Sequence, residues 1–178
     1  WPAGKAGQGM GLLHRVSQVT ADNFPQFHPV LDQLWQRMLA GFNQQYLVKK
    51  DGAFVDWRYL SNPCRQYRVL LVQHRLTNTP VGLIVLKELP DHLLLMDLIA
   101  MPRDFSRLVA LASNETASHP GKVLRTWCPE SWLQLFPLAH AQQMRLNIST
   151  PANIWTPGPA PETIQGRWWL MPGDTDFL

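Results

Sequence analysis

The sequence has little cysteine and no long apolar run. Cys64 and Cys128 are the only cysteines among 178 residues, and they lie far apart without the spacing of a metal site. Two isolated thiols favour reduced cysteines in an intracellular protein over a disulfide framework. No segment approaches the roughly 20 apolar residues that span a bilayer, and no signal peptide is visible. We therefore expect a cytoplasmic protein that does not insert into membranes.

Charged residues are also scarce, at 16% of the chain, with 16 Lys and Arg against 13 Asp and Glu. The basic residues are scattered, so the net charge of +3 does not favour nucleic-acid binding. The hydrophobic content of 46% is enough for one full-sized core in a chain of this length. We predict a single domain over residues 14–178, preceded by a Gly-rich linker or boundary segment at residues 1–13.

Three strand patterns follow one another in the middle of the chain. Residues 67–72 and 80–87 are apolar and rich in β-branched residues, and residues 77–79 between them have turn chemistry. This combination predicts an antiparallel hairpin. Residues 92–101 are apolar at almost every position, as in a strand covered on both faces. The three segments predict the centre of a sheet.

Further helices and strands are predicted around this centre from apolar spacing, capping residues and prolines. In chain order they are a strand over 14–20, a helix over 27–42, a short helical segment over 46–59, a helix over 105–112 capped by Asp104, a short strand over 123–127, a fourth helix from Pro129 to about residue 140, and a closing hairpin of strands over 145–150 and 167–171. This order predicts an α/β (α+β) fold with a mixed, mostly antiparallel sheet of six to seven strands and helices on both faces.

Two motifs resemble one enzyme superfamily. The first is the polar-aromatic turn Asp56-Trp57-Arg58-Tyr59, followed by Asn62-Pro63 and Tyr67 ahead of the hairpin. The second is the pair of tryptophans and the Gly-Asp turn near the end, Trp168-Trp169-Leu170 and Gly173-Asp174-Thr175-Asp176. With the order of elements, they make the chain from His14 to Leu178 resemble GNAT-like domains of bacterial proteins. Some of those proteins carry two such domains in tandem, and the Gly-rich beginning suits the second of a pair.

The resemblance implies a GNAT acyl-CoA N-acyltransferase fold and acyl transfer from acetyl-CoA to an amine of a small molecule or amino sugar. In that fold the fourth and fifth strands splay apart around the pantetheine arm, and the amides that open the next helix hold the pyrophosphate. Here Leu98, Ile99 and Ala100 would flank the pantetheine. The residues on the phosphate side would be Arg103, Phe105, Ser106 and Arg107, with both arginines on one helical face.

The resemblance also implies catalytic and acceptor residues, and each has a structural alternative. Asp97 is the candidate base, or else a carboxylate that caps a neighbouring turn or pairs with an arginine. His140 is the candidate acid, or else a helix-terminal histidine. The acceptor pocket would be lined by Trp57, Arg58 and Tyr59, or Trp57 belongs to the core while Arg58 pairs with Asp56 or Asp97. Asp174 and Asp176 are interpreted as turn formers and not as a metal site.

The chain departs from the GNAT pattern at the phosphate loop. Residues 102–107 contain no glycine, and Asp104 would occupy as a helix cap the amides that phosphate needs. This departure favours a second hypothesis, a catalytically silent GNAT-like module that binds a partner, a second copy of the chain or a missing N-terminal domain. The acyltransferase and the silent module both stay open on the sequence.

Overall fold

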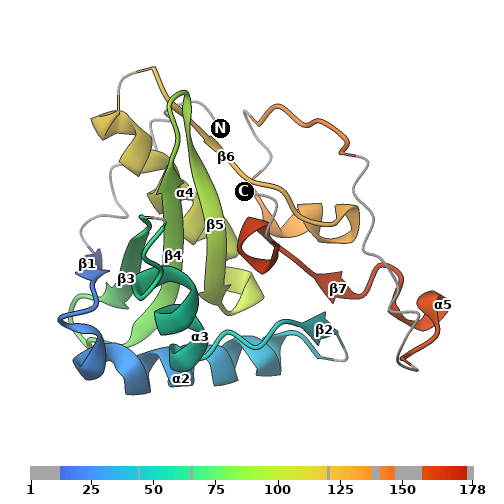
Figure 1. The fold of residues 1–178 in the computed structure, drawn as a ribbon, viewed down its shortest axis with the longest axis horizontal. Helices are drawn as coiled ribbons and strands as arrows, with labels where there is room; N and C mark the ends of the chain where they lie inside the picture. Colours follow the sequence, from blue (N-terminus) through green and yellow to red (C-terminus); the bar gives the residue numbers. More distant parts are fainter. Residues whose placement is uncertain are drawn as a thin grey trace.

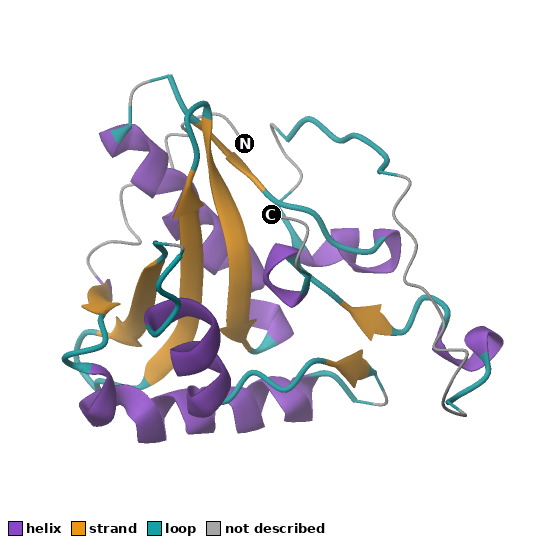
Figure 2. Cartoon of the chain, in the orientation of Figure 1, coloured by secondary structure: helices purple, strands orange, loops and turns teal. Residues whose placement is uncertain are grey.

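A computed structural model of the chain describes residues 13–43, 45–64, 66–119, 121–137, 141–146 and 158–175. The main sheet has five strands: β1 (His14–Val19), β3 (Arg68–His74), β4 (Pro80–Glu88), β5 (His92–Ala100) and β6 (Val123–Arg125), side by side in that order. All neighbours are antiparallel except β5 and β6, which are parallel. The predicted α+β class with a mixed, mostly antiparallel sheet is confirmed (Figure 2). The predicted six to seven strands in one sheet are wrong for the described residues, because two of the strands form a separate small sheet.

Helices cover both faces of this sheet. Tyr59 of the short helical turn η1 (Asp56–Leu60), which continues α3 (Gly52–Val55), bonds to Asp97 of β5. Ala100, three residues further along β5, lies on the opposite face, where Gly82 of β4 also meets Leu108 of α4 (Phe105–Glu115). Figure 1 shows α3 in front of the strands and α4 behind them.

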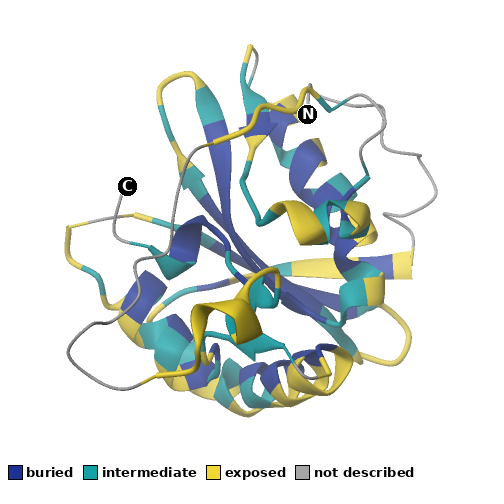
Figure 3. Ribbon diagram, turned by 90° about the vertical axis from the view of Figure 1, so that its right-hand side faces the viewer, coloured by how far each residue is buried: buried dark blue, intermediate teal, exposed yellow. Residues whose placement is uncertain are grey.

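The core consists of the central strands and the apolar stripe of α2 (Phe24–Gly41). β5 is buried from Leu93 to Ala100, which confirms the predicted strand that is covered on both faces. α2 buries residues at helical spacing, because three- and four-residue steps return to the same face: Leu31, Leu34, Trp35 and Met38. Figure 3 shows these buried segments meeting in the middle of the molecule.

The predicted fourth helix is wrong in the part of the chain that the structure describes. Only a six-residue 3₁₀ segment forms there, η4 (Glu130–Leu135), and Phe136 is extended. Pro137 accounts for the end of the segment, because a proline pushes the residue before it out of the helical region. His140 lies outside the described residues.

The predicted closing hairpin is wrong in its pairing. β7 (Trp168–Trp169) pairs in parallel with β2 (Tyr46–Leu47), a segment that was predicted to be helical, and the two form a separate small sheet. Residues 145–146 are irregular, and the rest of the predicted strand over 145–150 lies outside the described residues, as do residues 1–12 of the predicted linker. The short helix α5 (Pro161–Ile164) precedes β7. None of the helices described is long and apolar enough to cross a membrane.

Candidate functional site

β5 and β6 pair only along the first half of β5. Their register runs from His92 opposite Val123 to Leu94 opposite Arg125, and one further bond joins Thr126 Oγ1 to the Leu95 carbonyl at 2.9 Å. A register shift between β4 and β5 leaves Met96 without an opposite residue, which makes it a β-bulge. Residues 97–100 therefore pair with β4 on one side, and residues 96–100 do not pair with β6 on the other.

The C-terminal turn η5 (Pro172–Asp174) packs against this second half of β5. A Cβ on Gly173 would overlap the Tyr59 hydroxyl and lie 3.0 Å from the Met96 carbonyl oxygen, so only glycine allows so close an approach. Figure 1 shows β7 and the turn after it (red) beside β5, on the side away from β4. The chain thus covers part of the strand edge that the GNAT resemblance assigned to pantetheine.

An aromatic cluster joins α2, α4, η4 and β7. Its members have ring centroids 4.9–6.4 Å from their neighbours, and they are Phe42, Phe105, Trp132, Phe136 and Trp169. Phe42 caps the end of α2 and Phe105 begins α4, so the cluster joins the helices of the two sheet faces. All members except Trp132 are buried. Phe105, a predicted cofactor residue, is therefore a core residue of this cluster.

A fully buried ionic network lies where η5 meets β5. Lys50 Nζ is 2.7 Å from Asp97 Oδ1 and 2.8 Å from Asp174 Oδ2, and all three side chains are inaccessible to solvent. The Tyr59 hydroxyl donates to Asp97 Oδ2 at 2.9 Å. The amides of Leu98 and Met171 donate to Asp97 and Asp174, respectively. Both oxygens of Asp97 thus have partners within the protein.

The pKa values in this network follow from burial and from the ratio of two carboxylates to one ammonium. Burial raises the pKa of Asp97 to about 6, and Asp174 adds to the rise while Lys50 and Tyr59 oppose it. Burial alone would lower the pKa of Lys50, but the two carboxylates outweigh it and the net shift is upward. Burial and the Asp97 charge raise the pKa of Tyr59 well above its usual range, so its hydroxyl stays a donor.

Arg58 is the second residue that holds the C-terminal turn. Its Nε donates to the Gly173 carbonyl at 3.1 Å, and one terminal nitrogen donates to the Thr175 carbonyl at 2.5 Å. Arg58 is buried, so these bonds are formed away from bulk water. The predicted pairing of Arg58 with Asp56 or Asp97 is wrong, because Asp56 bonds to Ser61 and Asp97 bonds to Lys50 and Tyr59, while carbonyls of the turn accept from Arg58.

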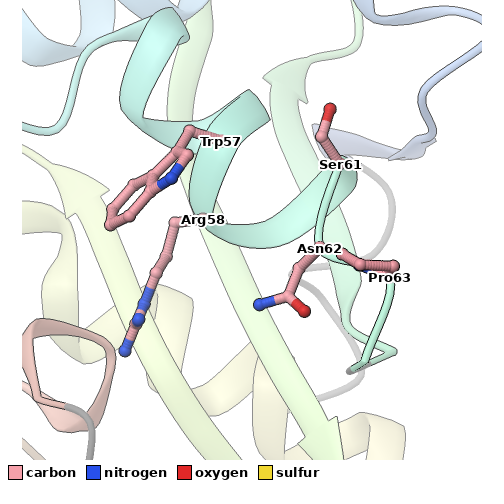
Figure 4. Close-up of a pocket in the computed structure, with 5 residues that line it drawn as sticks. All are labelled: Trp57, Arg58, Ser61, Asn62 and Pro63. Carbon is pink, nitrogen blue, oxygen red and sulfur yellow. The ribbon is translucent and has the colours of Figure 1, made fainter.

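The three predicted acceptor residues do not line one common pocket. Trp57 and Arg58 line a small open pocket of about 220 Å³ together with Ser61, Asn62 and Pro63. In Figure 4 the Trp57 ring and the Arg58 side chain extend from the same turn, and Asn62 extends toward Arg58. Trp57 is 66% exposed, whereas Tyr59 is 2% exposed and belongs to the ionic network. The structural alternative that put Trp57 in the core is therefore wrong.

The start of α4 differs from the predicted capped helix. Asp104 makes no side-chain cap bond, which corrects that prediction. Met101 separates the end of β5 from the helical turn η2 (Pro102–Asp104). Backbone carbonyls, and not the Asp104 side chain, accept the hydrogen bonds of the first amides. The amide of Asp104 donates to the Met101 carbonyl at 2.9 Å, and that of Phe105 donates to the Pro102 carbonyl. Ser106, Arg103 and Arg107 are exposed.

Sequence reasoning missed Lys50, the centre of the buried network. Nothing in the local pattern separates it from Lys49, its neighbour, which is 73% exposed. Asp97 and Asp174 were singled out, but as a base and a turn former and not as two partners of one cation. Asp176 lies outside the described residues. Among the residues described, no group of three His, Cys, Asp or Glu is placed to hold a metal.

No protein-family model matches the chain, and a search of curated proteins finds no significant match. The GNAT resemblance therefore depends on the motifs and the order of elements alone.

Proposed function

We propose that this chain is a GNAT-like domain that serves as a binding module and does not transfer acyl groups. The observation that carries the proposal is the position of the C-terminal turn. Pro172–Asp174 packs on the half of β5 that a GNAT enzyme would keep open for pantetheine, and Lys50 and Arg58 fasten it there.

The topology supports the GNAT-like architecture. The antiparallel run β1-β3-β4-β5 is followed by helix α4 and then by β6, parallel to β5, so β5 and β6 stand in the places of the fourth and fifth strands of that fold. The two strands stop pairing after Leu94, and β5 has a bulge at Met96. In this proposal the splayed strands are retained, and the space between them is used for the protein's own packing.

The groups that would hold acetyl-CoA do not fit it. Leu98, Ile99 and Ala100 are buried, and the Leu98 amide is bonded to the Asp97 carboxylate. At the phosphate position, the amides of Asp104 and Phe105 are bonded to backbone carbonyls. Free amides at a helix N-terminus are the basis of pyrophosphate binding, so their loss removes most of the site.

Asp97 also fits a structural role better than a catalytic one. A general base must reach the proton that it abstracts directly or through one water. Asp97 is inaccessible, and its two oxygens bind Lys50, Tyr59 and the Leu98 amide. A buried carboxylate with an ammonium partner is the arrangement expected of an internal ion pair.

The acyltransferase is the second candidate, and the same strand divergence favours it. The turn η5 packs on the part of β5 that does not pair with β6, so displacement of the C-terminal segment would expose the edge of β5 there. In that case acetyl-CoA would be the cofactor and a small amine the acceptor.

An NMR titration separates the two candidates. The amides of residues 96–100 report on the edge of β5, and acetyl-pantetheine, which has no phosphate, is the probe that isolates this edge. We expect no perturbation of these amides by millimolar acetyl-CoA or acetyl-pantetheine, and no thiol release when amines are added. Saturable perturbation of residues 96–100 by both probes would overturn the silent module in favour of the enzyme.

A further inference from the structure

The strand β1 forms one edge of the main sheet. It pairs with β3 on one side, and no strand of the described chain pairs with it on the other. Figure 1 shows β1 at the left margin of the sheet. An edge strand presents a row of backbone N–H and C=O groups to which a further strand can bond. The sheet can therefore be extended at β1.

The hydrogen bonds around β1 show which of its backbone groups face outward. In an antiparallel pair, residues that bond to the neighbouring strand alternate with residues whose groups point away from it. The Arg75 amide donates to the Leu13 carbonyl at 2.8 Å, so Leu13 faces the β3 side. Because the register is continuous, every second residue from Leu13 onward bonds to β3. The N–H and C=O groups of Val16 and Gln18 lie between these residues and point outward.

Asn23 confirms this alternation and ends the open part of the edge. Its side-chain nitrogen donates to the Gln18 carbonyl at 3.0 Å, and its Oδ1 accepts from the Thr20 amide at 2.8 Å. Both backbone groups would otherwise face a neighbouring strand, so the Asn23 side chain takes the place of that strand beyond Gln18. The outward groups of Val16 lie before this point, where no described strand covers them.

β1 lacks the features with which proteins usually protect an edge, which are lysines, prolines and bulges. Its sequence, His-Arg-Val-Ser-Gln-Val, contains no proline, lysine or carboxylate, and its register with β3 has no bulge. Arg15 is its one residue with a permanent charge, and the guanidinium donates to Gln73 of β3 at 3.0 Å. Val16 is 42% exposed, and Leu13, just before the strand, is 52% exposed. The edge is therefore open to another strand.

We infer that β1 pairs antiparallel with β1 of a second copy of the chain, with Val16 opposite Val16 across a two-fold axis. In this register the outward amide and carbonyl of Val16 bond to those of the second copy, and two β-branched side chains face each other. Arg15 lies opposite Ser17 of the second copy, so no like charges are opposed. The strand is complementary to itself, which favours a second copy over an unrelated strand.

The neighbouring registers are less favourable. A shift of the second copy toward the start of β1 would place Arg15 opposite Arg15, and like charges directly opposite one another destabilise a strand pair. A shift toward the end would place Ser17 opposite Ser17 and make the bond between Val16 and the Gln18 carbonyl central, where Asn23 already donates. The register centred on Val16 avoids both conflicts.

This inference deepens the proposed binding function, because it gives the domain a surface and a partner. It does not depend on the loss of acyl transfer, since β3 and β4 separate β1 from β5. One short strand pair is small beside the roughly 1,200–2,000 Å² that stable interfaces bury. We therefore expect a weak dimer with a dissociation constant of about 10–100 µM.

Sedimentation of the 178-residue chain over a range of concentrations is the first test. The wild type should pass from monomer to dimer as the concentration rises through the expected dissociation constant. Val16→Lys and Val16→Glu should each weaken the dimer about tenfold, because the valine pair is lost and two like charges take its place. Leu39→Lys is the matched control: Leu39 is 44% exposed and lies on α2, near the end that approaches Pro102, and its replacement leaves association unchanged.

A mixture of the two Val16 variants tests the register itself. With Val16 opposite Val16, the introduced lysine of one chain faces the introduced glutamate of the other, so an equimolar mixture of V16K and V16E should associate about as tightly as the wild type. The inference is overturned if the wild type stays monomeric up to about 0.5 mM, well above the range expected for so small an interface. It is also overturned if L39K weakens association as much as V16K does, or if the mixture does not associate.

Hydrogen exchange gives a second readout and keeps this inference separate from the proposed function. The outward amide of Val16 should become protected as the chain is concentrated, while the amides of Arg15 and Ser17, which face β3, should be protected at every concentration. The amides of residues 96–100 should not respond, because they lie on a different strand. Protection of Val16 that does not change with concentration would contradict the pairing, and binding of acetyl-CoA at residues 96–100 would overturn the silent module alone.

Discussion

Lys49 and Lys50 are adjacent in the chain and have opposite environments. Lys49 is on the surface, 2.6 Å from the Asp51 carboxylate, while Lys50 is fully buried between Asp97 and Asp174. An exposed ion pair is screened by water and contributes about 0–1 kcal/mol. A buried carboxylate that loses its cation has no water to solvate its charge, so the loss of the pair costs much more.

Replacement of Lys50 should therefore destabilise the fold far more than replacement of Lys49. We expect Lys50→Met to lower the free energy of unfolding by about 3–5 kcal/mol, because two buried carboxylates lose their only ammonium partner. Lys49→Met, the matched control, should change it by less than about 1 kcal/mol. Urea unfolding at neutral pH measures both. Equal losses in the two variants would contradict the structural role of Lys50.

Asp97 gives stability a dependence on pH. Its folded-state pKa of about 6 lies above the usual value of 3.8, so the native state binds the proton first as pH falls. Its contribution is therefore greatest at low pH and is lost as the pH rises from about 4 through about 6. Asp97→Asn removes this titration. The free energy of unfolding of the wild type minus that of the variant should fall over this window, and a flat difference would refute the assignment.

At the scale of single elements, two aspartates precede two helices and only one caps its helix. Asp51 has an extended backbone, and its side chain accepts a hydrogen bond from the Phe54 amide at 3.0 Å. Asp104 has a helical backbone because η2 continues into α4, and it makes no cap bond. A cap residue needs the non-helical backbone that turns its side chain toward the amides of the first turn.

The two aspartates should therefore respond differently to alanine. Asp51→Ala should lower the free energy of unfolding by about 0.5–2 kcal/mol, the usual worth of an N-cap. Asp104→Ala should change it by no more than about 0.5 kcal/mol, as for an ordinary surface substitution. Chemical denaturation of the two variants side by side is the measurement. A loss in Asp104→Ala as large as in Asp51→Ala would indicate a cap in solution.

The whole molecule is closed by its C-terminal segment. η5 and β7 lie against β5, β2 and the aromatic cluster, and Arg58 and Lys50 hold the turn from the other side. Because β7 belongs to a separate two-stranded sheet and not to the five-stranded one, we expect the segment to open before the main sheet does. Segments held by few contacts exchange their amides through local opening.

Arg58→Gln should loosen the C-terminal turn and leave the sheet intact. The variant loses the bonds to the Gly173 and Thr175 carbonyls. Hydrogen exchange of the Met171, Asp174 and Thr175 amides, which are bonded within the turn, should become faster, while the amides of β4 and β5 stay protected. Arg68→Gln is the control, because Arg68 pairs with Glu115 elsewhere on the molecule. Unchanged exchange at the turn would show that Arg58 does not hold it.

Local sequence patterns predicted the elements that depend on neighbours in the chain. The apolar run of β5 and the three- and four-residue spacing of α2 each describe a surface that must be buried, and both elements formed where predicted. The identity of β7 as a strand also followed from its residues, but its partner did not.

Only the tertiary structure decided which charges meet and what covers β5. Lys50 reaches Asp97 across 47 positions and Asp174 across 124, and no local periodicity relates residues so far apart. The same holds for β2 with β7. The sequence by itself determined the central strands and the helix α2, because their formation depends on spacing along the chain. The network and the covered edge of β5 depend on packing, which brings distant residues together and buries them.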